Sequence, residues 1–498
     1  MDNPRLKNFT EWYQEAIRLA DMAENSIVRG CMVIKPWGMG TWERMQRLLD
    51  DRIKATGHDN CYFPLFVPVS LFLKEAAHVE GFAKEMALVT HTRLRIVDGQ
   101  VKVEGALEEP LVVRPTSETI IAESFAQWIQ SYRDLPVLIN QWANVVRWEM
   151  RPRLFLRTSE FLWQEGHTAH ATAKEAEIET MKMLEVYRAF MEDKLALPVM
   201  IGEKSAGERF PGAVATYSLE AMMQDGKSIQ AGTSHYLGTG FAKAANIQFQ
   251  NKEGALEHVH TTSWGVSTRM IGAVIMTHGD DDGVRMPPAV APHQVVFVPI
   301  IRDEGDEALL MPFIEALAEK ARGVSFQGEP VRVKIDARDK KSTDKRWDWV
   351  KKGAPIVVEV GPRDVAKGEV CWLDRTDIKK KNFEGGDAFV AQLGARLEAI
   401  QKALYDQAKQ FRDANIRTDI TDYETFRAYF KPKAEYLGKK GAPGWVRAYW
   451  CEDEATLEPI KDIAVTVRNI PFDQKGVKGK CVLTGRDADR EVLFGRAY

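Results

Sequence analysis

The sequence predicts an α+β fold divided into several domains, and three observations support this. The chain has 498 residues, enough for about three domains of ordinary size. Residues 200–275 contain strand-like segments with glycines at the turns. After a proline-rich break at residues 286–294, short buried strands alternate with helical segments. We therefore expect a strand-rich domain followed by a compact α/β domain.

The overall composition is that of a soluble globular protein, with 45% hydrophobic and 28% charged residues. A formal net charge of -3 excludes a global basic field of the kind that marks many nucleic-acid binders. The five cysteines are too few and too scattered for a disulfide scaffold. The N-terminus lacks the apolar segment of a signal peptide, and no run of apolar residues is long enough to span a membrane. We therefore expect a cytoplasmic protein with reduced thiols and no membrane partner.

The N-terminal region is predicted to be mainly helical. Apolar residues recur at helical spacing over 9–25 and again over 41–55, where Gly57 marks the end. The apolar stretch that follows contains Pro64 and Pro68. Because proline cannot donate to a strand ladder, this stretch is expected to form an edge or irregular strand.

The middle of the chain is predicted to alternate between strands and helices. We expect a strand over 111–115, a helix from Ser117 and a strand pair around 145–149. After the proline-rich break, short strands are separated by helical patterns, and residues 387–413 form a long helix. The predicted domain boundaries are 1–288, 289–412 and 413–498.

Several common catalytic motifs are missing. The sequence contains no GxxxxGK[ST], HExxH or GxSxG pattern, which argues against a P-loop, a zinc protease helix and a nucleophile elbow. His167 and His170 are three residues apart, a spacing that would suit metal binding on a helix. In a strand, however, that spacing places the two side chains on opposite faces. A metal site there is therefore the less favoured interpretation.

The placement of arginines gives a stronger signal. Arg147 and Glu149 alternate in VVRWE and are expected on one face of a strand, with Arg157 and Phe161 following after a short loop. Guanidinium groups bind phosphates bidentately, and an aromatic ring stacks on adenine. This set of side chains suits ATP. The alternative is a surface network of ion pairs on a β-hairpin, and spacing alone leaves both open.

The flanking segments favour the first interpretation. RPTSE (114–118), RWE (147–149), RTSEF (157–161), QAGTSH (230–235) and a segment at 263–283 occur in the order found in class II aminoacyl-tRNA synthetases. Together they resemble that class, and most closely its prolyl-tRNA synthetase family. The HIGH and KMSKS strings of class I synthetases are absent.

The resemblance implies a fold and an activity. The expected fold is an antiparallel catalytic sheet flanked by helices, followed by an α/β anticodon-binding domain and a small mixed C-terminal domain. The expected activity is attachment of L-proline to tRNA(Pro) through a prolyl-adenylate, with ATP as a substrate and Mg²⁺ as its counter-ion. The segment around Pro64 and Pro68 resembles the dimerisation element, so a homodimer is expected. Residues 170–267 leave no room for an editing insertion, as in the archaeal and eukaryote-like type, and no editing in cis is expected.

By the same resemblance, the site residues divide into two groups. Arg147 and Arg269 are the expected catalytic residues. The predicted ATP-binding residues are Arg147, Glu149, Arg157, Phe161, Gln230, Thr233, Ser267 and Arg269. The predicted proline-binding residues are Thr116, Glu118, Arg147, Trp163, Glu165, His167 and His235. Two alternatives remain open, since TSET at 116–119 is also a helix-capping pattern and Trp163 could be a plain core residue.

Expectations outside the catalytic site also follow from the resemblance. Residues 331–352 contain nine lysines and arginines against four aspartates, which is either a solvated face or a tRNA-binding edge. Glu359 and Arg363 are the expected anticodon contacts. Cys451 and Cys481 stand at two positions of a four-cysteine zinc site, but Thr456 and Thr484 replace the other two. Two thiolates cannot form a closed structural site, so no zinc is expected.

Two other functions compete with this interpretation. A non-catalytic paralogue would be expected to have lost the ATP arginines, yet these are all present. A threonyl or seryl synthetase is the second alternative. Threonyl enzymes use a catalytic zinc with a cysteine ligand, and no cysteine occurs between Cys61 and Cys371.

Overall fold

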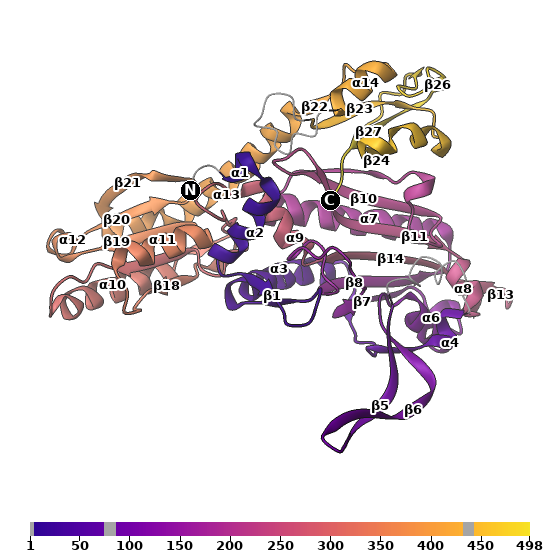
Figure 1. The fold of residues 1–498 in the computed structure, drawn as a ribbon, viewed down its shortest axis with the longest axis horizontal. Helices are drawn as coiled ribbons and strands as arrows, with labels where there is room; N and C mark the ends of the chain where they lie inside the picture. The colour runs from indigo at the N-terminus through magenta and orange to yellow at the C-terminus, as the bar shows by residue number, and fades with distance from the viewer. Residues whose placement is uncertain (1–3, 74–85, 432–442) are drawn as a thin grey trace.

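The computed structural model describes residues 4–73, 86–431 and 443–498. A large sheet occupies the centre of the molecule, a smaller α/β unit lies to one side, and a third unit lies against the far edge of the large sheet (Figure 1). None of the helices in these ranges combines the length and apolar character that crossing a bilayer requires.

The central sheet has eleven strands in the order β22-β23-β27-β24-β9-β10-β11-β14-β8-β7-β3. Their bounds, in that order, are Ile416–Arg417, Trp445–Trp450, Arg490–Gly495, Thr466–Pro471, Val199–Glu203, Ala215–Met222, Ser228–Gly238, His260–Ser267, Glu160–His170, Val137–Val146 and Asp59–Asn60. The strands from β9 to β7 pair antiparallel, which confirms the predicted catalytic sheet. C-terminal strands extend the same sheet through β24, a continuity that the sequence did not predict.

Helices cover the back of this sheet. The helix α7 (Ala173–Leu195) begins at a capping box, because Thr172 and Glu175 each accept a hydrogen bond from the other's backbone N–H. Its Met183, Tyr187 and Met191 are fully buried and form one core with Trp264 of β14 and with α9 (Arg269–His278). This packing leaves the opposite face of the sheet available for a site.

The N-terminal helices differ slightly from the prediction. The helix α2 (Phe9–Leu19) ends earlier than predicted, and β1 (Ala23–Asn25) follows it. The helix α3 (Pro36–Lys54) begins earlier, because Pro36 occupies its first turn, where a missing N–H costs nothing. The predicted strand through Arg147 and Glu149 is wrong, since β7 ends at Val146.

The α/β unit follows the predicted alternation. Its sheet has the order β18-β15-β19-β20-β21, with bounds Val333–Ile335, Val295–Pro299, Ile356–Val360, Glu369–Asp374 and Asp377–Gly385. The first three strands are parallel, and the last two are antiparallel. The unit's helices are α10 (Asp306–Arg322), α11 (Ser342–Lys352), α12 (Pro362–Lys367) and the long α13 (Gly386–Ala414). This confirms an α/β domain that ends in a long helix.

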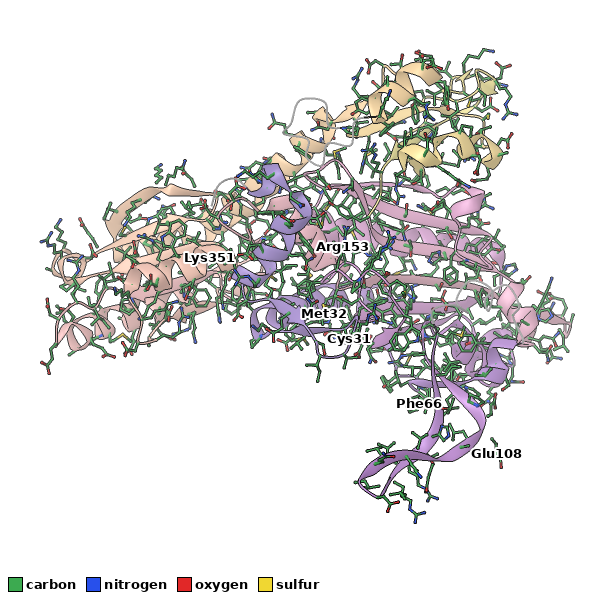
Figure 2. The ribbon with its side chains drawn as sticks, in the orientation of Figure 1. Cys31, Met32, Phe66, Glu108, Arg153 and Lys351 are labelled. Carbon is green, nitrogen blue, oxygen red and sulfur yellow. The ribbon has the colours of Figure 1, made fainter. Side chains whose placement is uncertain are left out.

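A long hairpin projects from the catalytic body. Its strands β5 (Ala87–Val97) and β6 (Gln100–Val113) pair with each other, and β4 (Phe66–Pro68) pairs with the base of β6. Figure 2 shows Phe66 near that base and Glu108 farther out along the hairpin. Pro68 lies at the edge of this sheet, as the prolines predicted.

Shorter elements complete the chain. They are α1 (Pro4–Lys7), β2 (Met32–Ile34), α4 (Val69–Leu73), α6 (Glu118–Trp128), α8 (Gly240–Ala244), β12 (Gln248–Gln250), β13 (Leu256–His258), β16 (Ser325–Phe326), β17 (Glu329–Pro330), α14 (Tyr423–Phe430), β25 (Gly479–Lys480) and β26 (Asp487–Ala488). Short 3₁₀ helices span Tyr132–Asp134, Ala206–Glu208 and Glu454–Ile463.

Candidate active site

Two adjoining cavities lie over the middle strands of the central sheet. The first, of about 230 Å³, is lined by most of the predicted substrate residues, namely Thr116, Glu118, Arg147, Phe161, Trp163, Glu165, His167, Gln230, Thr233, His235, Ser267 and Arg269. The second, of about 220 Å³, is lined by the remaining two, Glu149 and Arg157. It shares Arg147, Phe161, Ser267 and Arg269 with the first. The structure therefore brings every predicted catalytic-domain residue together.

Strand geometry explains how one short segment supplies much of the first cavity. Trp163, Glu165 and His167 alternate along β8, so their side chains share a face. The neighbouring strand β14 lies in register with them, pairing Ser263 with His167 and Ser267 with Trp163. His170 belongs to the other face, where it contacts Thr168 rather than His167. The two histidines therefore do not meet, as the strand periodicity predicted.

One end of the cavity is built from carboxylates held by hydrogen bonds. The buried Glu165 carboxylate accepts from Ser117 Oγ at 2.5 Å and from Gln141 Nε2 at 2.6 Å, and His167 Nε2 lies 2.8 Å away. Thr116 Oγ1 donates to Glu118. Burial opposes protonation of His167, but the hydrogen bond and charge of Glu165 outweigh it and raise the histidine's pKa.

Two buried donors in this cavity have no protein partner within the described part of the chain. They are Trp163 Nε1 and Ser263 Oγ. A buried polar group without a partner costs free energy, so such groups usually await a ligand or water. Trp163 is only partly buried and lines the cavity, which disagrees with the alternative of a plain core residue.

The other end carries clustered guanidinium groups. The Arg147 guanidinium lies 5.6 Å from the Phe161 ring centroid and 5.5 Å from that of Trp163, and its Nε donates to Pro115 O at 2.9 Å. Arg269 donates to the Leu156 carbonyl at 3.3 Å. Burial, together with the charges of Arg157 and Arg147, lowers the pKa of Arg269 to about 10. Such mutual repulsion marks a site ready for anionic phosphates.

The RPTSE segment has a different local role from the capping alternative. The helix α6 begins at Glu118 with Ser117 at its N-cap, yet no side chain caps it, because Ser117 donates to Glu165 instead. Arg114 is fully buried and bonds Phe63 O at 2.6 Å and Asn144 O at 2.8 Å. That arginine therefore ties three chain segments together below the cavity.

Sequence reasoning missed several residues that line the first cavity. They are Glu208, Phe210, Thr216, Ala231, Gly232, Ser263, Trp264, Gly265 and Val266. Phe210 packs against His235 with ring centroids 4.7 Å apart, and Thr216 Oγ1 lies 3.0 Å from His235 Nδ1. Burial lowers the pKa of His235 to about 4, so this histidine is neutral at pH 7. The only local sequence signal for a loop over the cavity was the turn-forming stretch 204–213 before β10.

The C-terminal residue packs into the catalytic core. Tyr498 N donates to Ser228 O at 3.1 Å, and its hydroxyl contacts the buried Asp225. Lys227 Nζ lies 4.8 Å from the Tyr498 ring centroid, and the Arg153 guanidinium lies 5.9 Å from it. Because Arg153 belongs to the loop between Arg147 and Arg157, the chain end contacts the arginine side of the site.

The predicted anticodon residues occupy contrasting positions. Glu359 on β19 is buried, with Arg346 Nη1 at 3.3 Å and Lys381 Nζ at 3.1 Å from its carboxylate. Arg363 lies exposed in the first turn of α12. Several basic side chains of segment 331–352 form ion pairs within the unit. The pairs are Arg338 with Asp336, Lys340 with Asp348 and Arg346 with Glu359.

Some of the positions expected to correspond to a zinc site lie near one another in the C-terminal unit. Cys451 Sγ is 3.9 Å from Thr484 Oγ1, and Arg486 Nη2 donates to Cys451 Sγ at 3.0 Å and to Asp453 at 2.7 Å. Thr456 is turned away and bonds Trp450 Nε1. In the three described ranges, no group of three or more histidine, cysteine, aspartate or glutamate side chains is arranged to hold a metal.

Comparisons with known proteins identify the domains of the chain. Residues 101–278 match the tRNA synthetase class II core domain (G, H, P, S and T), residues 294–384 the anticodon binding domain, and residues 434–498 the prolyl-tRNA synthetase C-terminal domain. The C-terminal match includes residues 434–442, which lie outside the described part of the chain. These matches follow one another along the chain with no additional editing domain between them.

Individual relatives match over nearly the full length. The chain is 59% identical to a proline–tRNA ligase of Paramagnetospirillum magneticum, covering 99% of this chain and 98% of that protein. It is 56% identical to one from Protochlamydia amoebophila, covering 99% and 97%. The crystal structure of Cryptosporidium parvum prolyl-tRNA synthetase with halofuginone and AMPPNP is 37% identical, has a TM-score of 0.87 and is covered over 96% of its chain. The chain therefore belongs to the class II prolyl-tRNA synthetase family.

Proposed function

We propose that the two adjoining cavities join L-proline to ATP as prolyl-adenylate, the first step of the proline–tRNA ligase reaction. The observation that carries this proposal is the position of Arg147, which lines both cavities between the carboxylate end and the arginine end. A residue there reaches the carboxylate of an amino acid and the α-phosphate of a nucleotide together. The AMPPNP named for the Cryptosporidium parvum structure, an ATP analogue, supports a nucleotide in this site.

The carboxylate end is suited to proline. The secondary ammonium of proline needs acceptors, and Thr116 and Glu118 supply them in our proposal. Trp163, His167 and His235 surround the ring, while the Trp163 Nε1 and Ser263 Oγ donors await an acceptor on the substrate. Glu165 acts through its bonds to Ser117, Gln141 and His167, which hold the floor of the pocket in one arrangement.

The arginine end is suited to ATP. Phe161 stacks on adenine beside the guanidinium of Arg147, and Arg157 and Arg269 bind the phosphates. Gln230, Thr233 and Ser267 face the nucleotide from β11 and β14. Glu149, whose carboxylate lies 3.9 Å from Arg157, orients that arginine.

The chemistry follows from this arrangement. The proline carboxylate is already a nucleophile at pH 7, so it attacks the α-phosphorus without a protein base, and pyrophosphate leaves. Arg147 neutralises charge at the attacked phosphate, and Arg269 neutralises it at the γ-phosphate end. The 3′-terminal ribose hydroxyl of tRNA(Pro) then attacks the adenylate carbonyl and releases AMP. Catalysis is thus mainly positioning and charge neutralisation.

Magnesium fits this site as a companion of the phosphates. Glu149 is the carboxylate that lies beside the arginines, and a single carboxylate suits an ion held mainly by phosphate oxygens and water. When bound, Mg²⁺ would neutralise phosphate charge. Arg157 and Arg269 would orient the same phosphate groups.

Further expectations complete the proposal. The enzyme acts in the cytoplasm as a homodimer formed through the segment around Pro64 and Pro68, with domains at 1–288, 289–412 and 413–498. Arg363 contacts the anticodon stem-loop, and Glu359 holds Arg346 and Lys381 toward the same RNA. No zinc is bound at Cys451 and Cys481, and mischarged alanyl-tRNA is not cleared in cis. Sedimentation, elemental analysis and deacylation assays respectively test the dimer, the zinc and the editing.

The first experiment is ATP–pyrophosphate exchange with each of the twenty amino acids. We expect exchange to be strongest with proline, weaker with alanine or cysteine, and absent with threonine and serine. Exchange strongest with threonine or serine would favour a sister synthetase. The absence of exchange with any amino acid would contradict the adenylation proposal and favour a non-catalytic paralogue.

A further inference from the structure

The C-terminal unit is fused to the catalytic sheet beside the nucleotide site. β24 pairs with β9 through Ile470 and Glu203. The backbones of the two strands approach each other closely here. A Cβ placed on Gly202 would lie only 2.4 Å from Ile470 O. Figure 1 shows the C-terminal strands β24 and β27 on the side of the sheet where β10 lies, and β9 is the strand between β24 and β10. This junction places Arg468 of β24 against strand β10 of the catalytic core.

Arg468 meets a fully buried carboxylate there. Arg468 Nε lies 3.2 Å from Glu220 Oε2, and its Nη2 lies 3.1 and 3.3 Å from the two Glu220 oxygens. Ser228 and Ser218 also donate to this carboxylate, at 2.5 and 3.1 Å. Lys204 Nζ is farther away, at 3.5 Å, and itself donates to Arg468 O. Arg468 is therefore the principal cation for this carboxylate.

Glu220 lies directly beside the proposed phosphate site. It pairs with Gln230 across β10 and β11, so both side chains lie on the same face of the sheet. Gln230 lines the cavity, and its carbonyl accepts from Arg269 Nη1 at 3.4 Å. Burial and the charges of Arg157 and Arg147 have the largest effects on the pKa of Arg269, and all of them lower it. Smaller effects come from Glu220, whose charge raises this pKa, and from Arg468, whose charge lowers it. Glu220 and Arg269 are therefore neighbours that both adjoin Gln230.

The buried Glu220 carboxylate carries a negative charge that the surrounding groups have to compensate. Burial would raise the pKa of Glu220, but Arg468, Lys204 and the Ser228 hydroxyl hold it below its ordinary value, so the group is an anion. Loss of Arg468 would leave this buried anion incompletely neutralised, because the remaining close cation, Lys204, lies farther away at 3.5 Å. Arg269 already contacts Gln230, the strand partner of Glu220, so the remaining attraction toward Glu220 would draw the Arg269 guanidinium away from the phosphates.

We infer that Arg468 is a positioning residue for ATP, because by neutralising Glu220 it leaves the Arg269 guanidinium available to the triphosphate. The C-terminal unit is thus part of the nucleotide site, although none of its residues in the described ranges 413–431 and 443–498 lines the two cavities. This inference rests on the proposed role of Arg269 in phosphate binding.

Two single variants of the full chain are expected to act in opposite directions. Arg468→Met leaves the Glu220 anion without its main partner, so the KM for ATP in pyrophosphate exchange should rise on the order of tenfold. The KM for proline should stay within about twofold. Glu220→Gln keeps the shape but removes the anion, so the KM for ATP should fall about two- to threefold. If the Arg468–Glu220 pair were only structural, both variants would have a raised KM for ATP.

The double variant Glu220→Gln/Arg468→Met is expected to restore the KM for ATP to near the wild-type value, because no buried anion remains. Arg468→Lys keeps the positive charge but loses the bidentate geometry of the guanidinium, so its KM for ATP should lie between those of the wild type and Arg468→Met. Arg447→Met is the matched control. It breaks an ion pair with Glu491 in the same C-terminal sheet, away from the cavities, and should leave both KM values unchanged.

Several outcomes would overturn the inference. Among them are a rise in the KM for ATP in Glu220→Gln, equal rises for ATP and proline in Arg468→Met, and no recovery in the double variant. If Arg468→Met does not fold, Glu220→Gln and Arg468→Lys still decide the question. Failure of the proposed function would show separately, as no exchange by the wild type or an unchanged KM for ATP in Arg269→Gln.

Discussion

The two ends of the catalytic cavity meet their electrostatic requirements in opposite ways. At the proline end, carboxylates are held by neighbouring side chains, as Glu165 is by Ser117 and Gln141. At the nucleotide end, guanidinium groups donate to backbone carbonyls, as Arg147 does to Pro115 O and Arg269 to Leu156 O. In our proposal, one end is thus a preorganised acceptor set for an ammonium group, and the other is a cation cluster for phosphates.

This difference shows how a site can keep charge for a ligand. A backbone carbonyl orients a guanidinium without cancelling its charge, whereas a carboxylate partner would neutralise it. Glu220, the buried carboxylate near Arg269, is paired with Arg468. In the α/β unit, by contrast, Arg346 pairs directly with a carboxylate, that of Glu359.

The largest expected effect comes from Arg147, which lies where the two ends meet. Arg147→Ala should lower pyrophosphate exchange on the order of 10²–10³-fold, because a preorganised charge at the attacked phosphate is lost. The measurement is steady-state exchange at saturating and at limiting proline and ATP. Arg322→Ala serves as the control, since Arg322 forms an exposed i,i+3 pair with Glu319 on α10. A loss below tenfold would mean that Arg147 does not bridge the substrates.

The next effect separates the proline end from the nucleotide end. Glu118→Gln should raise the KM for proline about 10- to 100-fold, since a charged hydrogen bond is worth about 1.5–3 kcal/mol. The KM for ATP should change little. Exchange kinetics with each substrate varied in turn measure both values. If the two KM values rise together, the distinction between the ends fails at this residue.

The complementary change at the nucleotide end is smaller. Phe161→Ala should raise the KM for ATP by about two- to tenfold, because a stacking contact is worth about 0.5–1.5 kcal/mol. Phe161→Tyr keeps the ring and should bind ATP nearly as well as the wild type. An effect of Phe161→Ala on proline alone would be inconsistent with adenine stacking.

The smallest effect concerns two histidines of the same cavity. The pKa of His235 is lowered to about 4, so its contribution to stability is complete above about pH 6.5 and is lost as the pH falls toward 4. The pKa of His167 is raised, so its contribution is present below about pH 6.5 and is lost as the pH rises through the folded value. The difference in unfolding midpoint between wild type and each variant should therefore change with pH in opposite directions.

Thermal unfolding of His235→Phe and His167→Gln across this pH range provides the measurement. Each unit of pKa shift corresponds to about 1.4 kcal/mol, so the slopes should be resolvable. Parallel pH profiles for the two variants would show that the two histidines do not differ in protonation.

Local pattern predicted part of this site well. The period of two along the strand predicted that His167 and His170 lie on opposite faces of β8, because strand geometry is independent of distant contacts. The proline break and the strand–helix alternation likewise predicted a separate α/β unit. The prediction failed where a strand had to end, since β7 stops at Val146.

The sequence by itself determined the residue types at the site, their alternation along β8 and the order of the domains, because these follow from short-range periodicity and from the order of the motifs. Only the tertiary structure decided which side chains meet across long separations in the chain, as His235 meets Phe210 on a neighbouring loop and Glu220 meets Arg468 of the C-terminal unit. The physical reason is that strand pairing and burial select those partners. Neither leaves a local signal in the chain, because hydrogen bonds between strands are made by backbone groups that every residue carries.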